Sequence, residues 1–238
     1  MTPRIRLVGG ILSLFLCTTQ IQKAAAPADP DRDPQAPKLL QEARALIKGK
    51  RLPDAIEKCD QVIAAFNAHY EGRKEKIYCA RTSAESLGYL LKAASDKVNA
   101  ISLSATWADA YFIKAYALQD LGRVAEAKAT LKLALDLSPM SSHYLSELGN
   151  IYQAEKNWSK AEESFAAAED NAPISPDGVK AEELGRARRG LAYVFVEQGR
   201  LAEAEKKYQQ CLAADPKDTK AAQELEYVRG LRAKTKAR

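Results

Sequence analysis

Residues 142–175 read SHYLSELGNIYQAEKNWSKAEESFAAAEDNAPIS, and this stretch decides the fold. It contains Leu-x2-Leu-Gly-x2-Tyr over 145–152, then eight residues, then Ala-x3-Phe-x2-Ala over 161–168. Pro173 closes the stretch, and the residue 34 positions before it is Pro139. A closing proline therefore recurs after 34 residues, and a fixed period of this length indicates an internal repeat.

This spacing resembles one tetratricopeptide repeat, with Leu145 at the position where the family often has tryptophan. The resemblance implies two antiparallel helices in each repeat. It predicts an all-α protein, a right-handed α-solenoid of about five helix-turn-helix repeats with a C-terminal capping helix. Composition agrees, because 46% hydrophobic residues with only 7% aromatic ones suit closely stacked helices, and few segments alternate with a period of two.

Five repeats can be laid in register by placing each closing proline at position 32. They span 36–69, 74–107, 108–141, 142–175 and 185–218. Position 20 is alanine in every repeat, where the family's second helix crosses the first most closely. These residues are Ala55, Ala93, Ala127, Ala161 and Ala204. Position 15 is Gly88, Gly122 or Gly199 in three repeats, which suits a left-handed residue ending a helix, and Lys50 or Lys156 in the others.

Three departures from the register stand out. The second repeat carries Arg81 and Lys97 where apolar residues are expected, and residues 70–73 are extra before it. Residues 176–184 form a nine-residue insertion, which we interpret as extra helical turns with Ser175 as the N-cap. Residues 219–238 are predicted to form the capping helix and a basic tail, because an open end of a solenoid needs a polar cover.

Residues 1–28 are typical of a secretory signal peptide. Arg4 and Arg6 precede a short apolar run and a series of small residues, and cleavage is expected after Ala28. The apolar run is shorter than the about 20 residues that span a bilayer, so no membrane span is expected after cleavage. Leu16 stands where lipoproteins need a small residue, which argues against lipidation at Cys17. The Pro- and Asp-rich residues 29–35 are predicted to be a linker, and the protein is predicted to be periplasmic or secreted.

The charge of the chain does not indicate a nucleic-acid partner. The net charge is +5, but residues 1–28 contribute three basic residues and no acidic one, which leaves +2. A nearly balanced body lacks the basic surface that nucleic acids require.

In the resembling family, partners usually lie in a concave groove lined by the first helix of each repeat. Carrying those positions over predicts a groove with aromatic rings beside side-chain amides, a pairing that suits an extended or helical peptide. Arg189 is expected to be free for a partner, and any single ring could instead pack on a neighbouring helix. The predicted groove residues are Tyr78, Phe112, Tyr116, Gln119, His143, Asn150, Gln153, Arg189 and Tyr193.

No motif for catalysis, a cofactor or a metal is present. The two histidines, His69 and His143, have no second ligand at a metal-binding spacing. Acidic pairs such as Glu182-Glu183 are adjacent on a helix and are interpreted as solvated. We therefore expect a protein that is not an enzyme.

Three cysteines remain after cleavage. Cys59 and Cys79 fall on adjacent helices of the predicted register, which allows a disulfide as a hypothesis. Cys211 replaces a small core residue and is expected to be buried.

The leading functional prediction is an exported scaffold or adaptor that binds a partner peptide or helix in cell-envelope assembly or secretion. Two alternatives stay open. One is a dedicated inhibitor or immunity partner of one secreted protein, and the other is a platform for a cell-wall or lipid ligand.

Overall fold

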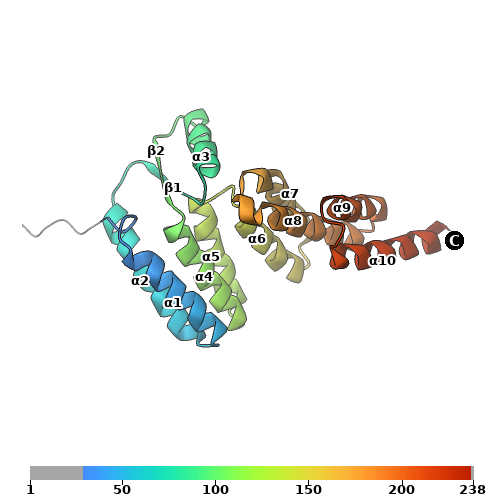
Figure 1. The fold of residues 1–238 in the computed structure, drawn as a ribbon, viewed down its shortest axis with the longest axis horizontal. Coiled ribbons are helices and arrows are strands. Elements are labelled where there is room, and N and C mark those ends of the chain that lie inside the picture. The colour runs from blue at the N-terminus through green and yellow to red at the C-terminus, as the bar shows by residue number, and fades with distance from the viewer. Residues whose placement is uncertain (1–28, 237–238) are drawn as a thin grey trace, which may run out of the picture.

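A computed structural model describes residues 29–236, so the signal peptide, the cleavage site after Ala28 and Cys17 lie outside the described residues. Helices stack in pairs along the long axis of the molecule, and a final helix closes the stack (Figure 1). The pairs are α1 (Gln35–Lys48) with α2 (Leu52–Tyr70), α4 (Thr106–Asp120) with α5 (Val124–Leu137), α6 (Ser142–Ala154) with α7 (Trp158–Asn171), and α8 (Asp177–Glu197) with α9 (Leu201–Ala214). The closing helix is α10 (Thr219–Lys236), and a short 3-10 turn, Ala172–Ile174, precedes α8.

Three-residue turns join the two helices of each pair, and all four turns have the same geometry. The middle residue has a positive φ whether it is glycine or lysine: Lys50 58°, Gly122 76°, Lys156 56° and Gly199 75°. The next amide reaches back five residues, as from Arg51 to Leu46, which is the 6→1 bond of a Schellman motif. The turn is therefore specified by the repeat, even where a side chain must adopt the left-handed conformation.

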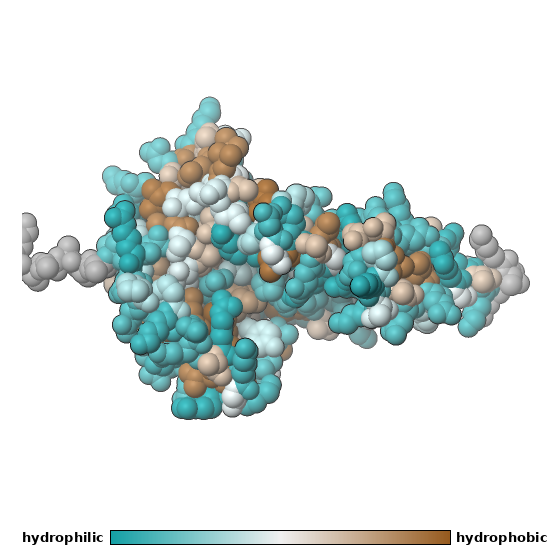
Figure 2. All heavy atoms as spheres, viewed as in Figure 1, coloured by the Kyte–Doolittle hydropathy of each residue, from teal (hydrophilic) through white to brown (hydrophobic). Residues whose placement is uncertain are grey.

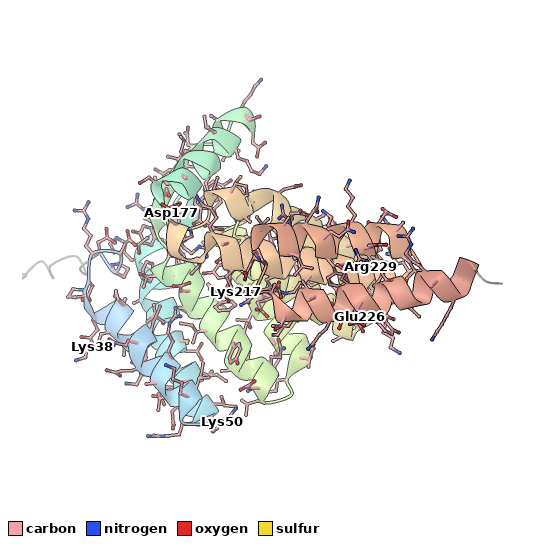
Figure 3. The ribbon with its side chains drawn as sticks, turned by 45° about the vertical axis from the view of Figure 1, so that its right-hand side comes forward. Lys38, Lys50, Asp177, Lys217, Glu226 and Arg229 are labelled. Atoms are coloured by element: carbon pink, nitrogen blue, oxygen red, sulfur yellow. The ribbon has the colours of Figure 1, made fainter. Side chains whose placement is uncertain are left out.

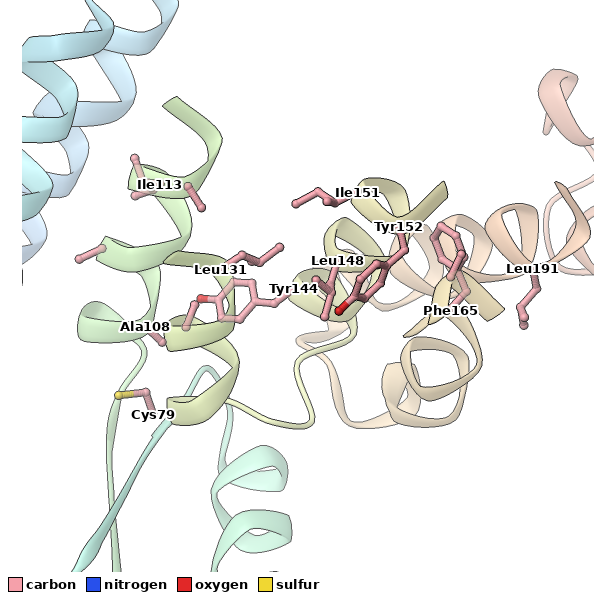
Figure 4. Close-up of a cluster of buried hydrophobic side chains, with 14 of the residues drawn as sticks. Cys79, Ala108, Ile113, Leu131, Tyr144, Leu148, Ile151, Tyr152, Phe165 and Leu191 are labelled. Atoms are coloured by element: carbon pink, nitrogen blue, oxygen red, sulfur yellow. The ribbon is translucent and has the colours of Figure 1, made fainter. Parts of the chain in front are cut away.

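Small residues allow the helices to approach closely. Ala55, Ala127, Ala161 and Ala204 are fully buried at the helix crossings. An apolar cluster runs along the stack from Leu131 on α5 past Tyr144 to Phe165 on α7 (Figure 4). Its continuity makes each pair depend on its neighbours, as in other solenoids.

The segment predicted to be the second helix pair, 74–107, is different. It forms β1 (Lys76–Ala80), α3 (Ser83–Ser95) and β2 (Ala100–Ser104), with the two strands parallel and in register. Helix α2 packs directly on α4, so the stack continues past this β-α-β insert, which projects to one side (Figure 1). The prediction of two helices was wrong because Ala-Ile-Ser-Leu-Ser alternates with the period of a strand.

The insert is a thin sandwich. Ile77, Cys79 and their neighbours on β2 face the main core, while Tyr78 on the other face stacks on Tyr89 of α3 at 5.2 Å between ring centroids. Gly88 lies inside α3 rather than at a turn. Ala93 is buried against this sheet rather than at a helix crossing.

Two departures from the repeat meet in space. Arg81, at the end of β1, donates hydrogen bonds to Glu85 of α3 at 2.7 Å and to Glu183 of α8 at 2.6 Å. Both carboxylates are buried, so the expectation of a solvated Glu183 was wrong. Ser175 also donates to Glu183, at 2.6 Å, and α8 begins two residues later with Pro176 as its N-cap. The prediction of Ser175 as the N-cap was therefore wrong, because its hydroxyl donates to this carboxylate. The nine-residue insertion is helical, as expected, and its extra turns hold the insert in place.

Candidate binding groove

The first helix of each pair and the closing helix line two adjoining pockets. The central pocket, of about 340 Å³, is defined by Arg44, Asp109, Phe112, His143, Val179 and Arg186. The C-terminal pocket, of about 590 Å³, is defined by Asn150, Gln153, Arg189, Tyr193, Lys220 and Glu224. Glu182 and Arg186 line both pockets, so together they form one groove from α1 to α10.

Aromatic rings and paired charges build the central pocket. The Phe112 ring stacks on Tyr144 at 5.0 Å and meets His143 edge-on at 4.7 Å. The Tyr144 hydroxyl donates to Asp109 at 2.5 Å, and Arg44 pairs with the same carboxylate at 3.2 Å. Because the charges satisfy one another, this pocket offers apolar ring surface more than unpaired charge.

His143 is neutral at neutral pH. Burial lowers its pKa below the ordinary value, and the positive charge of Arg186 lowers it further. The imidazole can therefore donate one hydrogen bond and accept another, and adds no positive charge to the pocket wall.

In the C-terminal pocket, arginine side chains are committed to partners within the chain. Arg186 donates to Glu147 at 2.6 Å and to Glu182 at 3.1 Å. Arg189 pairs with Asp218, which also caps α10 by accepting from the amide of Ala221 at 3.0 Å. The expectation of a free Arg189 was therefore wrong, because this arginine anchors the closing helix.

The structure separates the remaining predicted groove residues into three groups. Phe112 and His143 line the central pocket, and Asn150, Gln153 and Tyr193 line the C-terminal pocket. Tyr116, with 48% of its surface exposed, and Gln119 lie on α4 outside both pockets. Tyr78 is buried between β1 and α3, so its place in the groove was wrong.

Sequence reasoning missed the contribution of the closing helix. Lys220 and Glu224 line the C-terminal pocket from α10, where a further repeat would place its first helix. A signal was present, because α10 begins three residues after Pro216 as α6 begins three residues after Pro139.

Cys59, Cys79 and Cys211 are buried free thiols. Burial raises the pKa of Cys59 and of Cys79 to about 12, and that of Cys211 to about 11. The hypothesised Cys59–Cys79 bridge is therefore not formed in the structure, where Cys79 lies on β1 rather than on the helix that the register predicts.

Within residues 29–236, no three His, Cys, Asp or Glu side chains are grouped to hold a metal ion. Over the same range, no helix has the length and apolar character to cross a bilayer. Charged side chains such as Lys38, Asp177 and Glu226 point outward from the helices (Figure 3).

Sequence profiles of the tetratricopeptide repeat match residues 108–139 and 139–217. Tetratricopeptide repeats are therefore recognised within residues 108–217. A search of curated proteins found no match.

Solved structures share the fold across most of the chain. PilF from Pseudomonas aeruginosa is 13% identical with a TM-score of 0.58, over 84% of this chain and 70% of that one. MamA from Desulfovibrio magneticus RS-1, residue 41 to the end, is 14% identical with a TM-score of 0.55, over 86% and 89%. The expected helical repeat solenoid is confirmed.

Proposed function

We propose that this chain is a non-catalytic scaffold that holds a polypeptide segment of a partner protein in the groove. The observation that carries the proposal is the continuity of the two pockets along the first helices, with the partly exposed ring of Tyr193 in the C-terminal pocket. Tyr116, on α4 outside both pockets, adds a second exposed ring on a first helix. Exposed rings supply contact area, and the amides of Asn150 and Gln153 can pair with a peptide backbone.

Charge favours a polypeptide with polar and apolar side chains over a highly charged ligand. Arg44 is neutralised by Asp109, and Arg186 by Glu147 and Glu182. A polyanion would have to compete with these carboxylates for each guanidinium.

The proposed place of action is the cell envelope or the outside of the cell, in assembly or secretion. The support is the charge and hydropathy pattern of residues 1–28. A full-length chain with a C-terminal tag should be recovered from the periplasm or the medium with Asp29 as its first residue. Recovery of the intact N-terminus in the cytoplasm would contradict export.

The experiment that tests binding compares Tyr116→Ala and Tyr193→Ala with Leu133→Ala on α5, a second helix whose side chain is 46% exposed. We expect all three variants to melt close to the wild type, because each of these side chains is more than a third exposed and none belongs to the buried core. The two tyrosine variants should lose a protein captured from an envelope extract, and Leu133→Ala should retain it. Capture of no protein, with sedimentation of the purified chain on cell-wall sacculi or lipid vesicles, would replace the scaffold with a platform for those ligands.

A further inference from the structure

The outer edge of β2 has unpaired backbone groups. The amide of Lys76 donates to the carbonyl of Asn99 at 2.8 Å, which places Asn99 and alternate residues after it toward β1. Ala100 and Ser102 consequently turn their N–H and C=O groups outward. Within residues 29–236 these groups have no hydrogen-bond partner.

The other edge of the sheet is covered. On β1, the carbonyl of Cys79 accepts a hydrogen bond from the Ser138 hydroxyl at 2.6 Å. At the far end of β2, the outward amide of Ser104 donates to Asp31 at 3.0 Å. The open part of the edge is therefore confined to the outward groups of Ala100 and Ser102.

A cleft of about 550 Å³ adjoins this edge at Ser102. It is lined by Ser86, Leu87 and Leu90 of α3 and by Ser102 and Leu103 of β2. Leu87 is 58% exposed, and Leu91 one turn further is 61% exposed. Brown, hydrophobic side chains gather over α3 in the space-filling view (Figure 2). An exposed leucine stripe on a helix normally marks a surface that packs against something.

We propose that this edge binds an extended segment of a partner protein, which adds a third strand next to β2 and places apolar side chains against Leu87 and Leu90. A row of outward N–H and C=O groups selects a strand, because only an extended backbone can pair with alternate residues of the edge. A two-stranded sheet is also smaller than the sheets that are stable alone.

A second copy of this chain fits the edge less well. Two antiparallel β2 strands could pair Ala100 of one copy with Ser102 of the other, but residues directly opposite each other share a face of the sheet. A second copy would therefore place only alanine and serine side chains beside Leu87 and Leu90, whereas a partner strand with larger apolar side chains would cover them. The site is also distinct from the groove. Arg81 lines both the cleft and the central pocket, and its buried ion pairs with Glu85 and Glu183 lie between them.

Amide hydrogen exchange, followed by NMR on the full processed chain, tests this inference. In the free protein the amides of Ala100 and Ser102 should exchange fast, and those of Ile101 and Leu103 slowly. The probe is a blocked peptide of alternating threonine and valine with a lysine at each end. When the probe occupies the edge in about nine-tenths of the protein molecules, the Ser102 amide should exchange about tenfold more slowly. It can then exchange only in the one-tenth of molecules that are free of probe.

Matched variants locate the contact. Ser102→Pro removes an outward amide and leaves the β1–β2 ladder intact, so it should abolish probe binding. Ser102→Ala keeps the amide and should bind like the wild type. If the Ile101 amide exchanges faster in Ser102→Pro, the substitution has disturbed the β1–β2 ladder and a second test replaces it. In that test the wild-type protein is given a probe whose amides are N-methylated along one edge, and this probe should fail to bind. Tyr193→Ala in the C-terminal pocket should leave probe binding unchanged, which keeps this test separate from that of the proposed scaffold.

Three results would overturn the inference. Protection of Ser102 in the free chain that grows with protein concentration would show that a second copy covers the edge. Protection at every concentration would show that the chain covers its own edge. An unchanged exchange rate at millimolar probe would show that the edge does not accept a strand.

Discussion

The ring of Phe165 fills the space between two helices because each presents a glycine to it. A Cβ built on Gly149 of α6 would lie 2.9 Å from the ring, and one on Gly190 of α8 would lie 2.3 Å from it. Real contacts of carbon atoms are longer than either distance, so neither position accepts alanine without movement. These two glycines allow α7 to be shared by the pairs on both sides.

Gly190→Ala should therefore destabilise the protein by about 1–3 kcal/mol, the usual cost of overpacking. The urea unfolding midpoint measures it. Gly230→Ala is the matched control, since a Cβ there meets nothing within 4 Å and the residue is inside a helix. The control should be neutral or more stable than the wild type. Equal midpoints for the two variants would contradict the packing described for Phe165.

The thiols of Cys59, Cys79 and Cys211 should not react with thiol reagents in the native state. Burial raises their pKa values to about 11 or 12, so at pH 8 almost no thiolate is present to react. A chain beginning at residue 29 should show no reaction with a thiol reagent when folded and three thiols after denaturation without reductant. A count of one after denaturation would restore the disulfide.

Much at the residue scale follows from sequence, and the exceptions have physical causes. The crossing alanines and the left-handed turn positions follow from the period, because each helix pair needs a small residue at its crossing and a left-handed residue in its turn. Arg189 and Glu183 do not, because their partners Asp218 and Arg81 lie 29 and 102 residues away. No local pattern encodes such a pairing.

At the scale of elements, the Arg81 ion pairs join the β-α-β insert to the N-terminal turns of α8. One guanidinium stands between two buried carboxylates, and the Thr82 hydroxyl adds a bond to the carbonyl of Ile174 at 3.1 Å. Loss of the guanidinium would leave two buried negative charges without the cation that pairs with them.

Arg81→Met should consequently cost about 3–5 kcal/mol, the range for breaking a buried ion pair from one side. Lys92→Met removes an ion pair of the same insert whose members are about half exposed, and should change stability by less than about 1 kcal/mol. Hydrogen exchange of the β1 and α3 amides in both variants measures the difference. Similar protection in the two would show that the Arg81 ion pairs do not hold the insert.

The same cluster predicts a dependence on pH. Burial acts to raise the pKa of Glu183, but hydrogen bonds from Arg81 and Ser175 outweigh it and hold the pKa below its ordinary value. A carboxylate with a lowered folded pKa stabilises the fold above its unfolded pKa, about 4.3, and that stability is lost as the pH falls through the folded value. Between about pH 6 and pH 3 the unfolding free energy of the wild type should fall more than that of Glu183→Gln. A parallel decline would contradict the assignment.

For the elements, sequence alone marks where the pattern fails but not what replaces it. Arg81 and the nine residues 176–184 stand out as departures, and the structure shows that they meet. The strands were missed because alternation over only five residues, as in 100–104, is a weak signal, and the 34-residue register led us to expect helices there.

On the scale of the whole molecule, the closing helix completes both the core and the groove. Ala221, Leu225 and Val228 bury one face of α10 against the last pair, while Lys220 and Glu224 line the C-terminal pocket. The sequence predicts a capping helix, because the open end of a solenoid is apolar. The contribution of α10 to the groove could not be predicted, because it depends on how the helix is placed in three dimensions.

A chain ending at residue 217 should therefore melt at a lower temperature and lose binding at the C-terminal pocket. A chain ending at residue 233 keeps the buried face of α10 and should behave like the wild type. An unchanged melting temperature for the shorter chain would show that α10 does not close the stack.

The central claim is that the groove holds a polypeptide, and site-specific photo-crosslinking in cells tests it most directly. A photoreactive phenylalanine analogue replaces Tyr193 in the C-terminal pocket or Phe112 in the central pocket, or Leu133 on α5 as the control. The account predicts crosslinks to a protein from both groove positions and none from position 133. Crosslinks from position 133 alone, or groove crosslinks to lipid or glycan without protein, would contradict it.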